Sequence, residues 1–257
     1  MNDSPQKVNS ALLEVLKVYG LVTLATFAVT RLRGIDPVSE YVHLAVGAFF
    51  LFGALHMAGR DASGEGVKRF GIAVGGLLGP APDEGDPGPL GIYDLARTAK
   101  RSWRLALRET MIAIGVAALI FPFFAIGFAW WHGPEHPFAF RPPEDFASFA
   151  AAQIVVVGLP EEAFFRGFIQ TRLNDHWAAR RISVPGIADL DVRAWLLQAF
   201  LFGLIHFAVD LNPLRLAVFF PGLVFGLLRG WRGGIGAGIV FHALSNVYSE
   251  ILVRGWL

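Results

Sequence analysis

Three apolar stretches of this 257-residue chain contain polar side chains that could carry out catalysis. Glu161 and Glu162 lie in the first stretch, His206 lies in the second, and His242 and Asn246 lie in the third. Charged side chains are costly in hydrocarbon, so ionisable residues inside apolar segments indicate a functional site by default. These residues are therefore the first candidates for chemistry.

Helical spacing assigns different roles to the two glutamates. Glu162 and Arg166 are four residues apart, so they share one helix face and can form an ion pair. Glu161 points about 100° away and is left for another partner. His242 and Asn246 are also four apart and face one way. We therefore predict that Glu161 is a base and that Glu162 is a structural brace.

The residue types suit amide hydrolysis by activated water. A carboxylate beside an imidazole at low dielectric can take a proton from water, and Glu161 with His206 provides this pair. His242 and Asn246 could both donate to an oxyanion as a tetrahedral centre forms. Phe202 precedes His206 by one helical turn and would provide an aromatic shelf.

The candidate residues are predicted to lie at similar depths in the membrane. At about 1.5 Å rise per residue, Glu161 lies about 10 Å and His242 about 12 Å from the ends of their stretches that are predicted to face the cytoplasm. His206 lies nearer the middle of its stretch. Pro160 removes one backbone hydrogen bond just before the carboxylates, which favours a kink and a polar pocket there.

Structural explanations compete with each assignment. A Glu–Arg pair within a span is often a structural ion pair, and a lone intramembrane His or Asn often joins two helices. His43 and His56 have no carboxylate companion and are interpreted as structural. The metal-binding H-E-x-x-H pattern is absent, although Glu161, His206 and His242 are possible zinc ligands by type. A metal-free site is our first prediction and a zinc site the second.

The composition indicates a membrane protein. Hydrophobic residues make up 54% of the chain and charged residues 17%, below the roughly 25% of soluble domains. A net charge of +1 argues against nucleic-acid binding, and the absence of cysteine excludes disulfides and thiolate catalysis. The polar N-terminus has no small-residue cleavage site after it, so the first apolar run is predicted to be a retained helix.

The hydropathy pattern predicts an all-α bundle of seven membrane helices. Between the second and third helices, a Gly- and Pro-rich stretch at 79–89 predicts a flexible loop. The apolar piece 70–78 is too short to span, and we expect it at the membrane interface. Basic residues then recur along a predicted amphipathic or solvated helix up to Arg108. The predicted spans are residues 11–30, 41–58, 110–131, 146–168, 194–209, 214–228 and 234–253.

Charge asymmetry predicts the orientation. With the N-terminus inside, 15 Lys and Arg residues lie in inner segments and 5 in outer segments. Arg31 and Arg33 oppose this locally. No internal repeat is evident, so a transporter built from paired repeats gains no support.

The three motifs together resemble those of the CPBP family, which includes type II CAAX prenyl endopeptidases and bacterial Abi relatives. The family pattern is E-E-x-x-x-R, then F-x-x-x-H, then H-x-x-x-N. This chain has them in that order, beginning at Glu161, Phe202 and His242, and the resemblance extends over residues 110–253. Each motif is weak alone, but three in order inside apolar segments are specific.

The resemblance implies a glutamate-dependent protease without a required metal or cofactor. Glu161 and His206 would activate water, His242 and Asn246 would form the oxyanion hole, and the supporting residues would be Glu162, Arg166 and Phe202. It also implies eight helices around a cavity in the membrane. Since only seven spans are evident, residues 70–108 are where an eighth would lie.

The resulting hypothesis divides the chain into N-terminal membrane helices with a flexible loop (1–97) and a catalytic helical core (98–257). We expect a substrate that is a membrane protein or a lipid-modified protein, cut near its C-terminus or in its membrane segment. The expected location is the bilayer, as in a bacterial inner membrane, with the N-terminus cytoplasmic. The alternative is a non-enzymatic immunity or scaffold protein in which the same polar residues only join helices.

Overall fold

The computed structural model describes residues 5–73 and 92–257. Within these residues, seven helices are long and apolar enough to cross a membrane, so the predicted number of spans is confirmed. The chain is a polytopic helical membrane protein. The seven spans are Ala11–Thr30, Ser39–Gly59, Ser102–His132, Phe146–His176, Val192–Asp210, Pro213–Arg232 and Gly236–Trp256.

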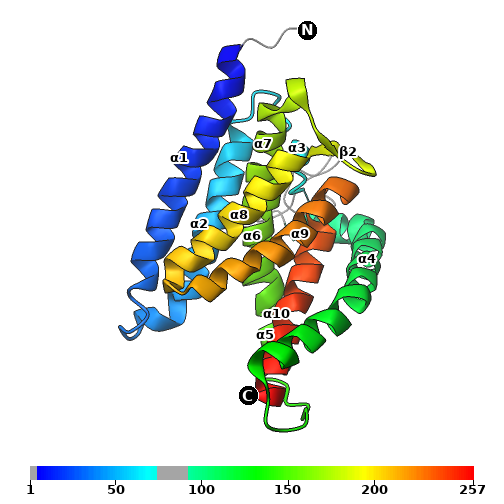
Figure 1. Cartoon of the computed structure of the whole chain (residues 1–257). Helices are drawn as coiled ribbons and strands as arrows, with labels where there is room; N and C mark the ends of the chain where they lie inside the picture. Colours follow the sequence, from blue (N-terminus) through cyan, green and yellow to red (C-terminus); the bar gives the residue numbers. More distant parts are fainter. Residues whose placement is uncertain (1–4, 74–91) are drawn as a thin grey trace.

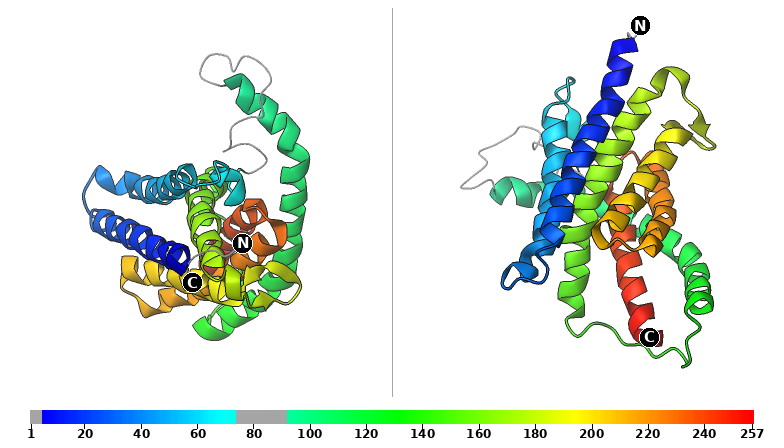
Figure 2. Two further views of the ribbon diagram at one scale, coloured as in Figure 1. Left: turned by 90° about the horizontal axis from the view of Figure 1, so that it is seen from above. Right: turned by 60° about the vertical axis from the view of Figure 1, so that its left-hand side comes forward.

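The spans are arranged around the fourth one. Helices α1 (Pro5–Thr30) and α2 (Val38–Gly59) lie side by side on one flank, followed by the short α3 (Gly66–Arg69). On the opposite flank, the curved helix α4 (Ile92–His132) wraps along α10 (Gly236–Trp256), as Figures 1 and 2 show. Between the flanks, α8 (Val192–Asp210) and α9 (Phe219–Arg232) form an antiparallel pair joined by the 3₁₀ segment η6 (Pro213–Val218).

The fourth span is a continuous helical run with two π-helical parts. It consists of α5 (Phe146–Ala152), the π segment η3 (Gln153–Gly158), α6 (Leu159–Glu162), the π segment η4 (Ala163–Ile169) and α7 (Gln170–His176). π turns are frequent at functional sites, and the extra residue in the turn rotates the side chains that follow it. Pro160, in the first turn of α6, has no backbone N–H to donate. The carbonyl oxygen of Val156, about one turn earlier, lies close to Gly47 of α2. A Cβ on Gly47 would lie 2.6 Å from this oxygen, so glycine is required there.

The fourth span extends eight residues beyond its predicted end at residue 168, as far as His176. The added turns are polar and are held by ion pairs. Arg172 pairs with both Glu14 of α1 and Asp175, the latter at 3.2 Å. The end predicted from hydropathy was too early, because hydropathy counts these charged residues as polar although ion pairs neutralise them locally.

A small β-hairpin is the one departure from an all-α fold among the described residues. After the short turn η5 (Ala178–Arg180), β1 (Ser183–Val184) pairs antiparallel with β2 (Ile187–Asp191). Asp191 then caps α8 by accepting a hydrogen bond from the backbone N–H of Arg193 at 2.8 Å. The hairpin thus fixes where α8 begins.

The region between the second and third spans differs from the prediction in two ways. The basic stretch and the third span form a single 41-residue helix, α4, rather than separate helices. Phe70 and Ile72 are buried in the core, not at the membrane interface, because the backbone of Gly167 leaves room for both. The predicted loop at 79–89, and any eighth helix between residues 74 and 91, lie outside the described residues.

The predicted boundary between residues 97 and 98 falls inside α4. Both N-terminal helices also pack directly on the second half of the chain. The hydroxyl of Tyr19 donates to the carbonyl of Leu201 at 2.9 Å. The two-part division therefore stays a prediction, and the packing joins its two parts into one core.

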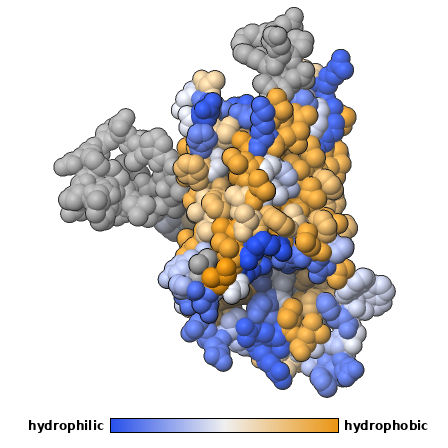
Figure 3. Space-filling view, turned by 90° about the vertical axis from the view of Figure 1, so that its left-hand side faces the viewer, coloured by the Kyte–Doolittle hydropathy of each residue, from blue (hydrophilic) through white to orange (hydrophobic). Residues whose placement is uncertain are grey.

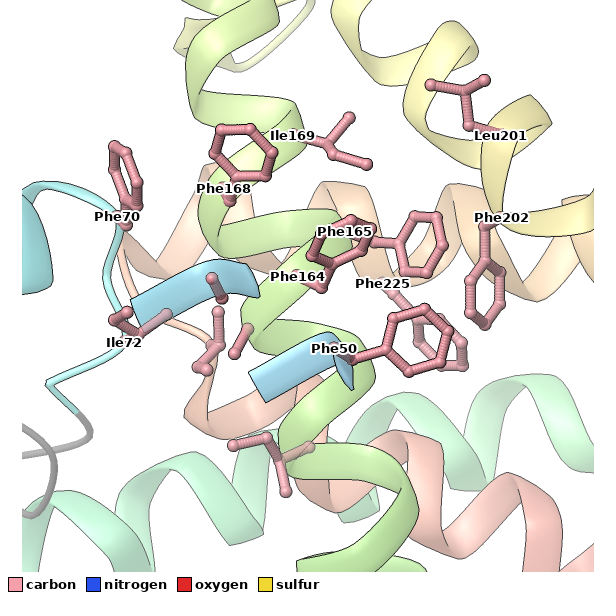
Figure 4. Close-up of a cluster of buried hydrophobic side chains, with 14 of the residues drawn as sticks. Phe50, Phe70, Ile72, Phe164, Phe165, Phe168, Ile169, Leu201, Phe202 and Phe225 are labelled. Atoms are coloured by element: carbon pink, nitrogen blue, oxygen red, sulfur yellow. The ribbon is translucent and has the colours of Figure 1, made fainter. Parts of the chain in front are cut away.

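Aromatic side chains fill the centre of the bundle. Phe164 and Phe165 are fully buried and pack edge to face, with ring centroids 5.2 Å apart. Phe50 of α2 and Phe202 of α8 both pack against Phe165, and Figure 4 shows these side chains together. Many large apolar side chains remain exposed on the outside, and Figure 3 shows them as a band with hydrophilic regions above and below. That band is the surface expected to face lipid.

Candidate active site

Glu161 is the point at which three helices converge. Its Oε2 atom lies 3.7 Å from Nε2 of His242 on α10 and 4.0 Å from Nε2 of His206 on α8. The carboxylate is mostly buried, with 12% of the side chain exposed, and Oε2 has no hydrogen-bond partner among the described residues. The fold thus brings together the three residues that sequence spacing selected. The separations slightly exceed direct hydrogen bonds, and a bridging water would fit distances of this kind.

Each imidazole is oriented by a bond at its other nitrogen. Nδ1 of His206 lies 2.8 Å from the carbonyl oxygen of Phe202, and Nδ1 of His242 lies 3.0 Å from Oε1 of Glu162. Both oxygens can only accept, so each Nδ1 carries hydrogen. In the neutral rings, Nε2 is then an acceptor facing Glu161. Three acceptors facing one another must share a proton or a water, which is the arrangement that general acid–base chemistry requires.

Glu162 has two partners rather than one. The predicted ion pair with Arg166 is present, with Oε1 and Nη1 3.0 Å apart and both side chains fully buried. The same Oε1 also accepts from Nδ1 of His242, a contact that spacing within one helix could not predict. Glu162 therefore orients His242, as a buried carboxylate orients a catalytic histidine.

Two aromatic rings hold the guanidinium of Arg166. It lies 4.1 Å from the ring centroid of Phe202 and 4.7 Å from that of Phe225. Phe225 also stacks on His242, with ring centroids 4.7 Å apart and planes 12° from parallel, and Phe202 meets His206 edge to face. Phe202 was predicted from its spacing. Phe225 was not, because its helix carries no ionisable motif residue.

Asn246 forms a hydrogen bond with Gln153, a residue that was not predicted from the sequence. Its Nδ2 donates to Oε1 of Gln153 at 2.8 Å, which joins α10 to the π segment η3. An amide nitrogen has two N–H groups, so one remains for another acceptor. A lone Gln eight residues before Glu161 in an apolar span was the signal that could have identified Gln153. The structure does not place Asn246 against Glu161, so its predicted role in the oxyanion hole stays a prediction.

Glycine permits the close approach of α10. A Cβ on Gly238 would lie 2.8 Å from Oε2 of Glu162, and a Cβ on Gly158 would lie 3.2 Å from the carbonyl oxygen of Ile239. Any side chain at Gly238 would displace the Glu162 carboxylate from the position it shares with His242 and Arg166. These two glycines set the distance between the helices that carry the site.

Across residues 5–73 and 92–257, no group of three His, Cys, Asp or Glu side chains is arranged to hold a metal ion. Glu161, His206 and His242 are possible zinc ligands by residue type, and the response of activity to chelation distinguishes a zinc-dependent site from a metal-free one.

The comparison with known families covers this part of the chain. Residues 143–248 match the family model described as Rce1-like, type II CAAX prenyl endopeptidase. The predicted resemblance is therefore confirmed over a shorter range than 110–253. All seven motif residues lie within the Rce1-like match, whereas α1, α2 and α4 lie outside it. No curated protein and no solved structure matches the chain.

Proposed function

We propose that this chain is an intramembrane endopeptidase that uses Glu161 to activate water. The observation that carries the proposal is the position of Glu161 Oε2, within 4.0 Å of the Nε2 atoms of two histidines on two other helices. The Rce1-like match supports the same reaction class, because the matched segment contains this convergence.

The geometry supports a mechanism without a covalent intermediate. A water held between Glu161 and His206 would lose a proton to this pair as its oxygen attacks the carbonyl carbon of the scissile peptide. His242 in its protonated form, oriented by Glu162, would donate from Nε2 to the developing oxyanion. The proton taken from water would then pass to the leaving amine as the C–N bond breaks. Asn246, one turn further along α10, would supply a second donor.

We propose a membrane protein or a lipid-modified protein as the substrate. Glu161 lies midway along the fourth span, fifteen residues from each of its ends at Phe146 and His176. At about 1.5 Å per residue, this is about 22 Å from either end of the helix. A scissile bond must therefore reach well inside the bundle, as a segment anchored in the bilayer can.

Replacing Glu161 tests the proposal. We expect Glu161→Gln to lower cleavage by roughly two to four orders of magnitude, the contribution typical of a general base, while the protein stays folded. The measurement compares membrane-protein termini, by mass spectrometry, between cells with the wild-type chain and cells with the variant. Glu250→Gln is the matched control, since Glu250 forms an exposed pair with Arg254 on α10.

Unchanged termini in cells with Glu161→Gln would contradict the proposal. Two results together would favour the non-enzymatic scaffold or immunity hypothesis instead. Cells with and without the wild-type chain would show the same membrane-protein termini, and the variant would bind its partners normally.

Treatment with a chelator distinguishes a metal-free mechanism from a zinc-dependent one. We expect activity of the purified protein to survive prolonged incubation with a zinc chelator, because water activation is assigned to Glu161 and His206. Activity that is lost on chelation and restored by added zinc would show that a metal is needed.

A further inference from the structure

A groove lined by α1 and α2 lies on the flank of the molecule opposite α4, where Figure 1 shows these two helices. It encloses about 770 Å³ and opens toward the surface expected to face lipid. None of the proposed catalytic residues lines it. Its apolar walls include Leu21, Ala25, Phe49 and Phe52.

Polarity changes along the groove in the same sense on both helices. On α1, Glu14 and Lys17 lie toward the N-terminal end beside Leu13, and Ala25 lies eight residues after Lys17, about 12 Å further along the axis. On antiparallel α2, Arg60 caps the end of the helix and Phe49 lies eleven residues earlier, about 16 Å away. One end of the groove is therefore cationic and the other apolar, which is the polarity of a phospholipid in a bilayer leaflet.

The cationic end has more positive than negative charge. Arg172 lies in the groove wall and is neutralised by Glu14 and Asp175. Lys17 and Arg60 also line the groove, are exposed, and form no ion pair with any residue in the described part of the chain. Two uncompensated cations next to an apolar channel attract a ligand that joins an anion to a hydrocarbon chain.

We propose that the α1–α2 groove binds an anionic phospholipid, with its phosphate at Lys17 and Arg60 and an acyl chain along Leu21, Ala25 and Phe49. A membrane helix from a partner protein would fill the apolar part but leave both cations without a counter-charge. Because α1 and α2 pack directly on the span that carries Glu161, the bound lipid stabilises the wall behind the catalytic helix.

Native mass spectrometry of the purified protein tests the proposal. The protein is exchanged into vesicles of phosphatidylglycerol and phosphatidylcholine, extracted, and analysed for retained lipid. We expect phosphatidylglycerol to be retained preferentially, and Lys17→Gln with Arg60→Gln to weaken that preference roughly tenfold or more. The charge-preserving pair Lys17→Arg with Arg60→Lys should keep it. Ala25→Phe, which fills the apolar end, should abolish retention of either lipid.

Arg104→Gln with Arg180→Gln is the matched control, because it removes two exposed cations outside the groove. Equal retention of both lipids by the wild type would overturn the proposal. So would equal losses in the groove and control double variants, or a wild-type dimer that Ala25→Phe dissociates without a change in bound lipid. Proteolysis by the Lys17→Gln and Arg60→Gln variant is measured separately, so failure here is distinct from failure of the proposed function.

Discussion

At the residue scale, the two neighbouring glutamates differ because their environments differ. Glu161 faces two histidine nitrogens and keeps a partly exposed side chain, whereas Glu162 is fully buried between Arg166 and His242. Sequence spacing predicted that the two side chains face different partners, since residues one apart on a helix point about 100° from each other. Their roles as base and brace stay predictions. Spacing missed the bond from His242 to Glu162, because a contact between distant helices leaves no trace in local spacing.

Removing Glu162 should cost more stability than removing its whole ion pair. Glu162→Gln leaves the Arg166 guanidinium buried without a counter-charge, which typically costs roughly 3–5 kcal/mol. We expect the double variant Glu162→Gln with Arg166→Met to unfold at a higher denaturant concentration than Glu162→Gln alone. Unfolding in mixed detergent micelles measures this. Equal midpoints for the single and double variants would show that the guanidinium keeps adequate partners in the Phe202 and Phe225 rings.

A single methyl group at Gly238 should impair catalysis through Glu162. Gly238→Ala places Cβ 2.8 Å from Glu162 Oε2, so the carboxylate must shift away from His242. We expect at least a roughly tenfold loss of cleavage, as occurs when the partner that orients a catalytic histidine is misplaced. The control is Gly115→Ala on α4, where a Cβ meets nothing within 4 Å. Full activity in Gly238→Ala would show that catalysis does not depend on the position of Glu162.

At the element scale, interruptions of regular α-helix set the positions of the side chains. The fourth span contains π turns on both sides of Glu161 and Glu162, and Pro160 lies between them. Hydropathy predicted this span but not its π turns, because the π geometry depends on packing against Gly47 and α10 rather than on local propensity. The start of α8, which delivers Phe202 and His206, is set similarly by Asp191 in the hairpin.

The cap at Asp191 makes folding stability depend on pH. Burial alone would raise the pKa of Asp191, but hydrogen bonds from Arg193 and from the Ile182 backbone N–H outweigh burial and lower the pKa to about 2. The unfolded value is about 3.9, so the stabilisation is fully present above about pH 4 and is lost as the pH falls toward 2. Asp191→Asn should therefore lower stability by on the order of 2 kcal/mol at pH 7 and by much less near pH 2.

Thermal unfolding of both proteins across this pH range measures the effect. Asp189→Asn is the control, because Asp189 forms an exposed pair with Arg181 in the same hairpin. A gap between wild type and Asp191→Asn that stays constant from pH 7 to pH 2 would contradict the assigned cause.

At the scale of the whole molecule, the number of spans and the motif residues were predictable from sequence, and the packing between the spans was not. Seven apolar stretches of sufficient length determine the spans, since lipid demands continuous helices. The burial of Phe70 and Ile72 behind Gly167 could not be predicted, because a short apolar segment fits an interface or a core equally well. Gln153 and Phe225 were missed for a related reason, since each acquires its role only from a neighbouring helix.

The packing of α1 and α2 on the fourth span has a consequence for genetics. Gly53 lies against the ring of Phe164, and Tyr19 is bonded to the carbonyl just before Phe202. A screen for loss of function should therefore recover substitutions throughout the first sixty residues, although the family match begins only at residue 143. If Glu161 has the proposed role, alleles at Gly47 and Gly53 should behave like weak alleles of Glu161. Selection on this protein would then act on a region that lies outside the family match.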